Sequence, residues 1–275
     1  MRTSDGCDVG RDDTGGVYVA MSLVGWVAGW VAVAADRPFH AFTPAHYLIL
    51  GIFAVGCAGV VAFGRRHRGK VAEVRIRRGF AALVLVVMVP ITLADFLPGQ
   101  FTRGASFPFQ LCDLAWMSAA YALWTLRPWA IALTYYWGLV LSVQGIITPS
   151  LGQSFPDPRF FGFWTRHFLI VWAAVYLTWG LRRVPGWHGY RVTVAATAVW
   201  AVLVAAFNTA AGTNYGYLNH KPGSASILNV MGPWPWYIGT EIGVLLLVWA
   251  LMTWPWVHAA GAPTATRPGN GGRSR

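Results

Sequence analysis

Two side chains able to do covalent chemistry, Cys112 and His167, each lie about one turn inside an apolar run. A thiol needs a base to become a thiolate nucleophile, and histidine is the usual base. A carboxylate can then orient the histidine and stabilise its charged form. Asp95, Asp113 or Glu241 can fill that role. Asp113 follows Cys112 directly, so on a helix the two side chains point about 100° apart.

Other polar residues fall near the same ends of the predicted apolar segments. Asn and Gln amides in such a set can stabilise an oxyanion. Each residue also has an ordinary explanation, because cysteine packs in cores and amides join membrane helices. Their shared depth nevertheless predicts one polar site, formed by segment residues His46, Asp95, Cys112, Asp113, Gln144, His167, Asn208 and Glu241 and by loop residues Asn214, Tyr215, Asn219, His220 and Lys221.

The composition predicts a membrane protein. The chain has 275 residues, of which 56% are hydrophobic and only 11% are charged. Soluble domains carry roughly 25% charged residues. Uncharged runs of about 20 residues recur along the chain, and such runs are long enough to cross ~30 Å of hydrocarbon. The expected fold is therefore an all-α polytopic membrane protein, a bundle of seven core transmembrane helices.

The spans follow from the positions of the apolar runs. An additional segment, Val17–Ala35, either forms an eighth span or lies at the membrane interface. We expect residues 17–256 to form a single integral membrane domain between two disordered tails, 1–16 and 257–275. The seven core spans are Ala45–Phe63, Gly79–Leu97, Phe107–Leu126, Trp129–Ile147, Phe160–Leu181, Val192–Ala211 and Trp234–Trp256.

Basic residues set the expected orientation. The formal net charge is +11, but the arginines gather in short loops, above all between Arg65 and Arg78, as the positive-inside rule requires. We therefore expect a multi-pass protein of the cell membrane with its basic loops and C-terminus in the cytoplasm. The polar site then lies near the extracytoplasmic face, and no nucleic-acid partner is expected.

No motif indicates a metal or another cofactor. The three cysteines, Cys7, Cys57 and Cys112, have no C-x-x-C spacing, and no H-E-x-x-H sequence occurs. Zinc is a rival use of the same polar residues, although we predict no metal site and no cofactor. The residues that zinc would use are His46, His167, His220, Cys112, Asp113 and Glu241.

Several short motifs carry a family resemblance over about residues 39–256. They include Gln110-Leu111-Cys112-Asp113, Tyr136-Trp137-Gly138, Asn214-Tyr215-Gly216-Tyr217-Leu218 and Gly232-Pro233-Trp234-Pro235-Trp236-Tyr237. In these motifs the chain resembles the YwaF-like bacterial integral membrane proteins. Those proteins are distantly similar to the animal transmembrane protein 164 family of acyltransferases, which remodel ether phospholipids. The resemblance implies that Cys112 is an acyl-accepting nucleophile and that His167 is its base.

We therefore expect a membrane acyltransferase or lipid acyl hydrolase that acts on phospholipid-like substrates, with membrane lipids as its partners. The expected catalytic residues are Cys112, His167, Asp113 and Asp95. A transporter of ions or small molecules, a metal-dependent membrane hydrolase and a non-enzymatic membrane protein stay open as alternatives. The expected substrate-binding residues are Gln110, Gln144, Asn214, Tyr215, Lys221, Trp234 and Glu241, with Lys221 placed to pair with a lipid phosphate.

Overall fold

The structure is a computed structural model that describes residues 39–223 and 227–261. The predicted N-terminal tail, the segment Val17–Ala35 and most of the C-terminal tail lie outside these residues. Every regular element within them is helical, which confirms the predicted all-α class. The elements are α2 (Pro44–His67), α3 (Ala72–Ala94), α4 (Leu111–Thr125), α5 (Pro128–Tyr136), η1 (Trp137–Ser142), α6 (Val143–Ile147), α7 (Pro158–Val175), η2 (Tyr176–Gly180), α8 (Trp187–Ala211), η3 (Tyr215–Tyr217), η4 (Ile227–Val230) and α9 (Trp236–Gly261).

Six stretches of helix in the described residues are long and apolar enough to cross a membrane. Two of them run through π-helical turns, because η1 continues α5 into α6 and η2 ends α7. All six coincide with predicted spans, so the chain is a multi-pass membrane protein. Their bounds are Pro44–His67, Ala72–Ala94, Pro128–Ile147, Pro158–Gly180, Trp187–Ala211 and Trp236–His258. Helix α9 continues to Gly261, past the predicted end of its span.

The seventh predicted span corresponds to α4, which is shorter than expected. It begins at Leu111 after extended Gln110 (φ −67°, ψ 147°), and it ends at Thr125, where Leu126 adopts a left-handed conformation (φ 56°). Pro128 follows closely and disfavours helix in the residue before it. Fifteen residues rise only about 22 Å, less than the ~30 Å of a hydrocarbon core.

The described chain divides into two compact units, and the larger one contains the candidate site. The smaller unit comprises Phe39 and residues 151–161. Its aromatic rings pack on one another: Phe160 lies 5.8 Å from Phe39 and 5.6 Å from Phe161, measured between ring centroids. The larger unit runs from His40 to Ser150 and onward from Gly162.

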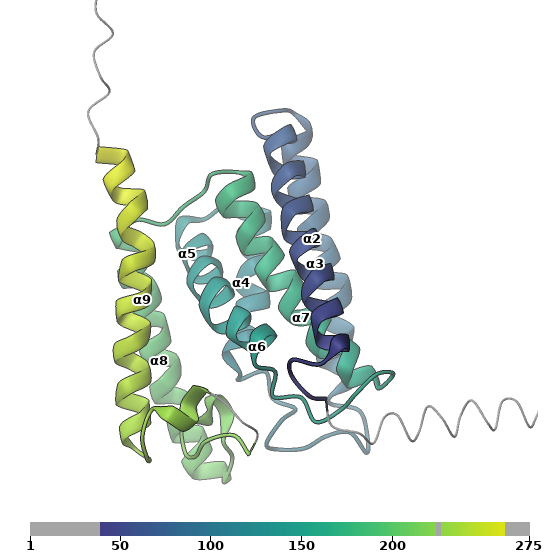
Figure 1. The fold of residues 1–275 in the computed structure, drawn as a ribbon, viewed down its shortest axis with the longest axis vertical. Coiled ribbons are helices and arrows are strands. Elements are labelled where there is room, and N and C mark those ends of the chain that lie inside the picture. The colour runs from purple at the N-terminus through teal and green to yellow at the C-terminus, as the bar shows by residue number, and fades with distance from the viewer. Residues whose placement is uncertain (1–38, 224–226, 262–275) are drawn as a thin grey trace, which may run out of the picture. The chain divides into compact units, whose positions relative to one another are not determined.

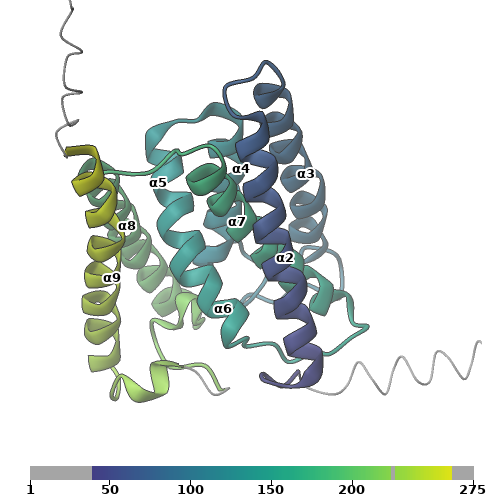
Figure 2. The ribbon, with the colours of Figure 1, turned by 45° about the horizontal axis from the view of Figure 1, so that its top comes forward.

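Helix α4 is a core element of the larger unit. It packs against α3, α5 and η1, and Ala115, Trp116, Ala119, Ala122 and Leu123 are all buried. Within this unit the α2–α3 pair lies on one side and the α8–α9 pair on the other, with α4 and α5 between them (Figures 1 and 2). Helix α4 is therefore held by packing against its neighbours, although it is shorter than a full span.

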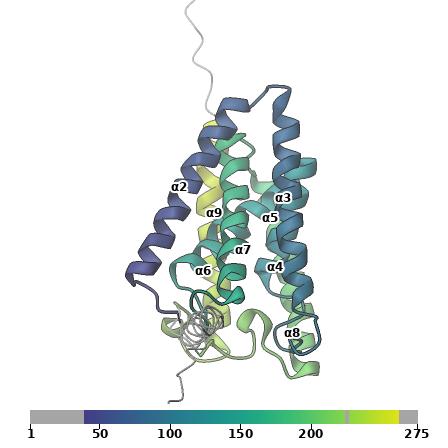
Figure 3. The same ribbon diagram turned by 90° about the vertical axis from the view of Figure 1, so that its right-hand side faces the viewer.

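The two ends of this unit differ in charge. The turn between α2 and α3 lies at one end, and the green connection from α8 to α9 lies at the other (Figures 1 and 3). The α2–α3 turn carries the basic run that begins at Arg65. Since α3 ends at Ala94 and α4 begins at Leu111, the first turn of α4 lies at the end away from that basic turn.

Candidate functional site

The first turn of α4 holds a buried ion pair. One carboxylate oxygen of Asp113, Oδ1, accepts a hydrogen bond from Arg166 Nη1 at 2.7 Å. The other, Oδ2, accepts one from the backbone N–H of Gln110 at 3.2 Å. The side chains of Arg166 and Asp113 are 18% and 6% exposed. Asp113 therefore caps α4 and neutralises an arginine that reaches in from α7.

Arg166 also influences the candidate nucleophile. Its guanidinium acts electrostatically on the thiol of Cys112, which is the second residue of α4 and is partly buried. A cation and a helix N-terminus both favour the thiolate form of a cysteine. The side chains of Cys112 and Asp113 point in different directions from the helix. Arg166 interacts with both of them, so the three residues form one candidate site.

Arg166 was not among the predicted site residues. It lies about two turns inside α7, in the half of that helix away from the basic α2–α3 turn. An arginine inside a membrane segment is costly unless it is paired, so its position was itself a signal. The partner could not be read from the sequence, because Asp113 is 53 residues away along the chain.

His167 is buried and has one nitrogen engaged. Its Nδ1–H donates to the carbonyl of Phe163 at 2.7 Å, and the two rings lie 4.2 Å apart. Nε2 is then the acceptor nitrogen, and it faces Gly145, where an added Cβ would lie only 2.9 Å away. Within residues 39–223 and 227–261 no hydrogen bond joins His167 to Cys112, so its role as the base stays a prediction.

Asp95 and His46 occupy different surroundings. Asp95 caps the end of α3, and its charge acts on both Asp113 and Arg166. His46 is fully buried: Nδ1 accepts a hydrogen bond from the N–H of Phe42, and Nε2 donates to the carbonyl of Ile146, both at 2.9 Å. Asp95 therefore contributes to the electrostatics of the site, whereas His46 joins α2 to α6.

The loop after α8 holds the segment that leads into α4. The hydroxyl of Tyr215 accepts from the N–H of Phe107 at 3.0 Å and donates to the carbonyl of Arg103 at 2.9 Å. Gly216 N–H donates to Gln110 Oε1 at 3.0 Å. Burial raises the pKa of Tyr215 above its ordinary value, which keeps the hydroxyl protonated as a donor. Tyr215 and Gln110, expected to bind substrate, thus fix the position of the chain before Cys112.

Two asparagines organise this loop from within. Asn208, at 0% exposure, donates to the carbonyl of Tyr215 at 2.9 Å and accepts from its N–H at 2.8 Å. Asn214 donates to the carbonyl of His220 at 2.8 Å and accepts from the N–H of Asn219 at 2.9 Å. The amide groups are therefore engaged inside the protein, and a contact between Asn214 and substrate stays a prediction.

The other expected substrate residues have few partners. Lys221 Nζ lies 5.6 Å from the ring centroid of Tyr237, and the indole N–H of Trp234 donates to the carbonyl of Leu218 at 3.2 Å. Gln144 and Glu241 are partly buried on α6 and α9. In the described part of the chain no hydrogen bond or ion pair engages their side chains. No group of three His, Cys, Asp or Glu residues there is arranged to hold a metal ion.

One comparison with known proteins identifies the family. A model of the TMEM164 family matches residues 41–253, more than three quarters of the 275 residues. No curated protein and no solved structure matches the chain. The match confirms the resemblance to the transmembrane protein 164 family and does not test the resemblance to YwaF-like proteins. The apolar helices and the extent of this match lead to one conclusion: the chain belongs to the TMEM164 family.

Proposed function

We propose that this protein is a membrane acyltransferase or lipid acyl hydrolase that acts on phospholipid-like substrates, with Cys112 as its nucleophile. The observation that carries the proposal is the position of Arg166, which pairs with Asp113 at the start of α4 and acts electrostatically on the neighbouring Cys112. A buried cation beside a thiol stabilises the thiolate, which is the reactive form. Family membership and the predicted acyl transfer of its animal members support the same chemistry.

The reaction divides into two steps. In the first, Cys112 Sγ attacks the ester carbonyl carbon while His167 Nε2 accepts the thiol proton. The carbon–oxygen bond then breaks, the lysolipid oxygen takes that proton, and an acyl thioester forms. In the second, a hydroxyl of an acceptor lipid or a water attacks the thioester, its proton passes through His167, and the thiol of Cys112 is restored.

The position of the site suits an ester substrate. In the proposed orientation the basic α2–α3 turn is cytoplasmic, and the start of α4 lies at the other end, near the extracytoplasmic face of the cell membrane. The ester carbonyl of a phospholipid lies at the boundary between headgroup and tail. The proposed nucleophile therefore meets its substrate without drawing the ester deep into the hydrocarbon core.

The substitution Cys112→Ala tests the nucleophile. We expect it to abolish acyl transfer from a labelled phospholipid in membranes that contain the protein, because alanine has no atom that can form the thioester. The matched control is Cys57→Ala, since Cys57 lies midway along α2. Acyl transfer that persists at the wild-type rate in folded Cys112→Ala protein would overturn the proposal.

The substitution Gly145→Ala tests His167 without removing it. The added Cβ would lie 2.9 Å from His167 Nε2 and would crowd the nitrogen that accepts the proton. We expect acyl transfer to slow by about a hundredfold, the lower end of the range for the loss of general base catalysis. Gly51→Ala is the control, because nothing lies within 4 Å of its added Cβ. Equal rates in both variants would remove His167 from the mechanism.

A further inference from the structure

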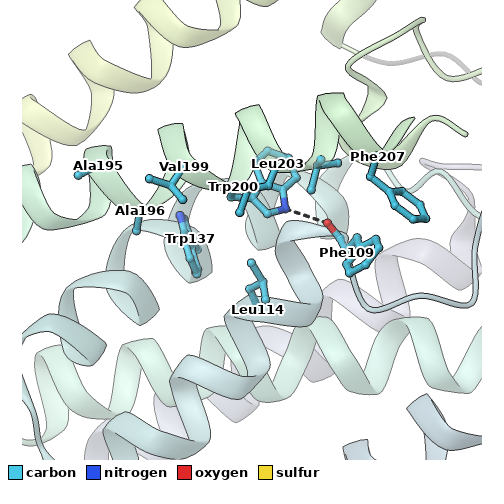
Figure 4. Close-up of a pocket in the computed structure, with 10 residues that line it drawn as sticks. Phe109, Leu114, Trp137, Ala195, Ala196, Val199, Trp200, Leu203 and Phe207 are labelled. Carbon is cyan, nitrogen blue, oxygen red and sulfur yellow. Dashed lines mark hydrogen bonds between the residues drawn. The ribbon is translucent and has the colours of Figure 1, made fainter. Parts of the chain in front are cut away.

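An apolar groove runs along α8 beside the start of α4 (Figure 4). Its volume is about 580 Å³. Helix α8 forms one wall through Val199, Leu203 and Phe207, and Phe109, Leu114 and Trp137 line the groove from the other elements. The proposed reaction uses none of these side chains.

Both tryptophans that line the groove have their indole N–H groups engaged in hydrogen bonds. The indole N–H of Trp200 donates to the carbonyl of Phe109 at 2.8 Å, as the dashed line in Figure 4 shows. The indole N–H of Trp137 donates to Thr197 Oγ1 at 2.9 Å. Every other lining side chain is Ala, Val, Leu or Phe. An occupant therefore meets a hydrocarbon surface and must itself be hydrocarbon.

The groove opens toward the lipid and ends near the candidate nucleophile. Helix α8 is one of the membrane-crossing helices, and Val199 and Leu203 on it are 59% and 64% exposed. At one end of the groove Phe207 lies against Phe109, with ring centroids 4.8 Å apart. Phe109 precedes Cys112 by three residues, so this end adjoins the proposed site.

The dimensions distinguish a lipid chain from a partner helix. The lining residues of α8 extend from Ala195 to Phe207, a rise of about 18 Å. An α-helix with its side chains is about 10–12 Å wide, so over this length it fills roughly 1,400–2,000 Å³. That is more than twice the 580 Å³ of the groove, whereas a single hydrocarbon chain is much thinner than a helix.

We infer that this groove binds one acyl chain of the lipid substrate, with the ester end of the chain toward Phe109 and Phe207. The inference rests on the proposed function for the identity of the substrate, but chain binding does not require that Cys112 reacts. The groove is then the part of the protein that distinguishes acyl chains by length and unsaturation.

Photocrosslinking in vesicles tests this site. The probe is a phosphatidylcholine that carries a diazirine near the end of one acyl chain, and the adducts are assigned to residues by mass spectrometry. We compare the wild type with Ala196→Phe, which fills the groove, and with Ala198→Phe, which makes the same change at an exposed position outside it. We expect groove adducts to fall about tenfold in Ala196→Phe only, equivalent to about 1.4 kcal/mol of binding free energy.

The wild-type adduct map decides the outcome even if Ala196→Phe does not fold. Adducts concentrated on groove residues such as Leu114 and Trp137 support the inference. Adducts spread over exposed residues such as Val55, Val86 and Val202 in proportion to exposure would mean annular lipid only and would overturn it. Groove adducts in a protein whose Cys112→Ala variant still transfers acyl groups would leave this inference standing and remove the proposed function.

Discussion

An arginine contacts each end of α4, and the two arginines have different partners. At the first turn Arg166 pairs with the carboxylate of Asp113 and acts electrostatically on the thiol of Cys112. At the last turn Arg77, 6% exposed, donates through Nη1 to the carbonyls of Leu123 and Trp124. An arginine thus pairs with a carboxylate at one end of α4 and donates hydrogen bonds to backbone carbonyls at the other.

The difference in partners distinguishes an arginine that stabilises the end of a helix from one that belongs to a candidate reactive site. The last carbonyls of a helix have no partner within the helix, and a cation there satisfies them and opposes the negative end of the helix dipole. Arg77 therefore completes α4, and the proposed reaction does not use it. At the first turn Arg166 faces groups that can change charge, so it can stabilise an anion that forms on Cys112.

The largest expected effect is that of Arg166→Met. Removal of one partner leaves the carboxylate of Asp113 buried without a counter-ion, which costs about 3–5 kcal/mol of stability. We expect thermal unfolding in detergent at a much lower temperature and no acyl transfer. The control is Arg191→Met, since Arg191 is exposed on α8.

The double variant Arg166→Met with Asp113→Asn sharpens this result. It removes both charges, so we expect it to recover part of the stability but none of the activity. Full recovery of acyl transfer in the double variant would show that the ion pair serves only to fold α4.

Arg77→Met should reduce stability less than Arg166→Met does and should leave acyl transfer unchanged. The loss of charged hydrogen bonds to backbone carbonyls costs about 1.5–3 kcal/mol, measured by thermal unfolding. The rate of acyl transfer per folded molecule should stay at the wild-type value. Arg78→Met is the matched control, because Arg78 lies over the ring of Trp124 at 5.3 Å and its loss should cost about 0.5–1 kcal/mol. A lower rate of acyl transfer per folded molecule in Arg77→Met would show that the two ends of α4 do not differ in function.

Tyr215→Phe should have the smallest effect on stability. It removes the hydroxyl that joins Phe107 and Arg103 and keeps the ring, at a cost of about 1 kcal/mol. Because this contact positions the chain before Cys112, we expect a lower kcat with little change in KM. The control is Tyr121→Phe, since Tyr121 is 43% exposed. Wild-type kcat in Tyr215→Phe would limit the loop to a role in folding.

Most of the fold could be predicted from the sequence. Apolar runs of membrane-crossing length located six helices, because a span must bury its backbone and carry almost no charge. The apolar run of the central segment suggested a full span, Phe107–Leu126. The structure has a shorter α4 because Gln110 is extended and Leu126 is left-handed.

The site was only partly predictable because its contacts join distant segments. The shared membrane depth of the polar residues and the position of Cys112 near a helix start were predicted from the sequence. The pairing of Asp113 with Arg166 depends on how α4 packs against α7, and a single sequence does not specify that packing. Tyr215 was expected to bind substrate, whereas its buried hydroxyl bonds to backbone groups of the segment before α4.

The most direct test of the central claim, that the first turn of α4 is the reactive end, is a search for an acyl thioester on Cys112. Purified protein in vesicles is incubated with a phospholipid that carries a labelled acyl chain, digested and examined by peptide mass spectrometry with and without hydroxylamine. We expect a hydroxylamine-sensitive acyl group on the peptide that contains Cys112, and none on the peptide that contains Cys57. Labelled product formed without any acyl group on Cys112 would contradict it.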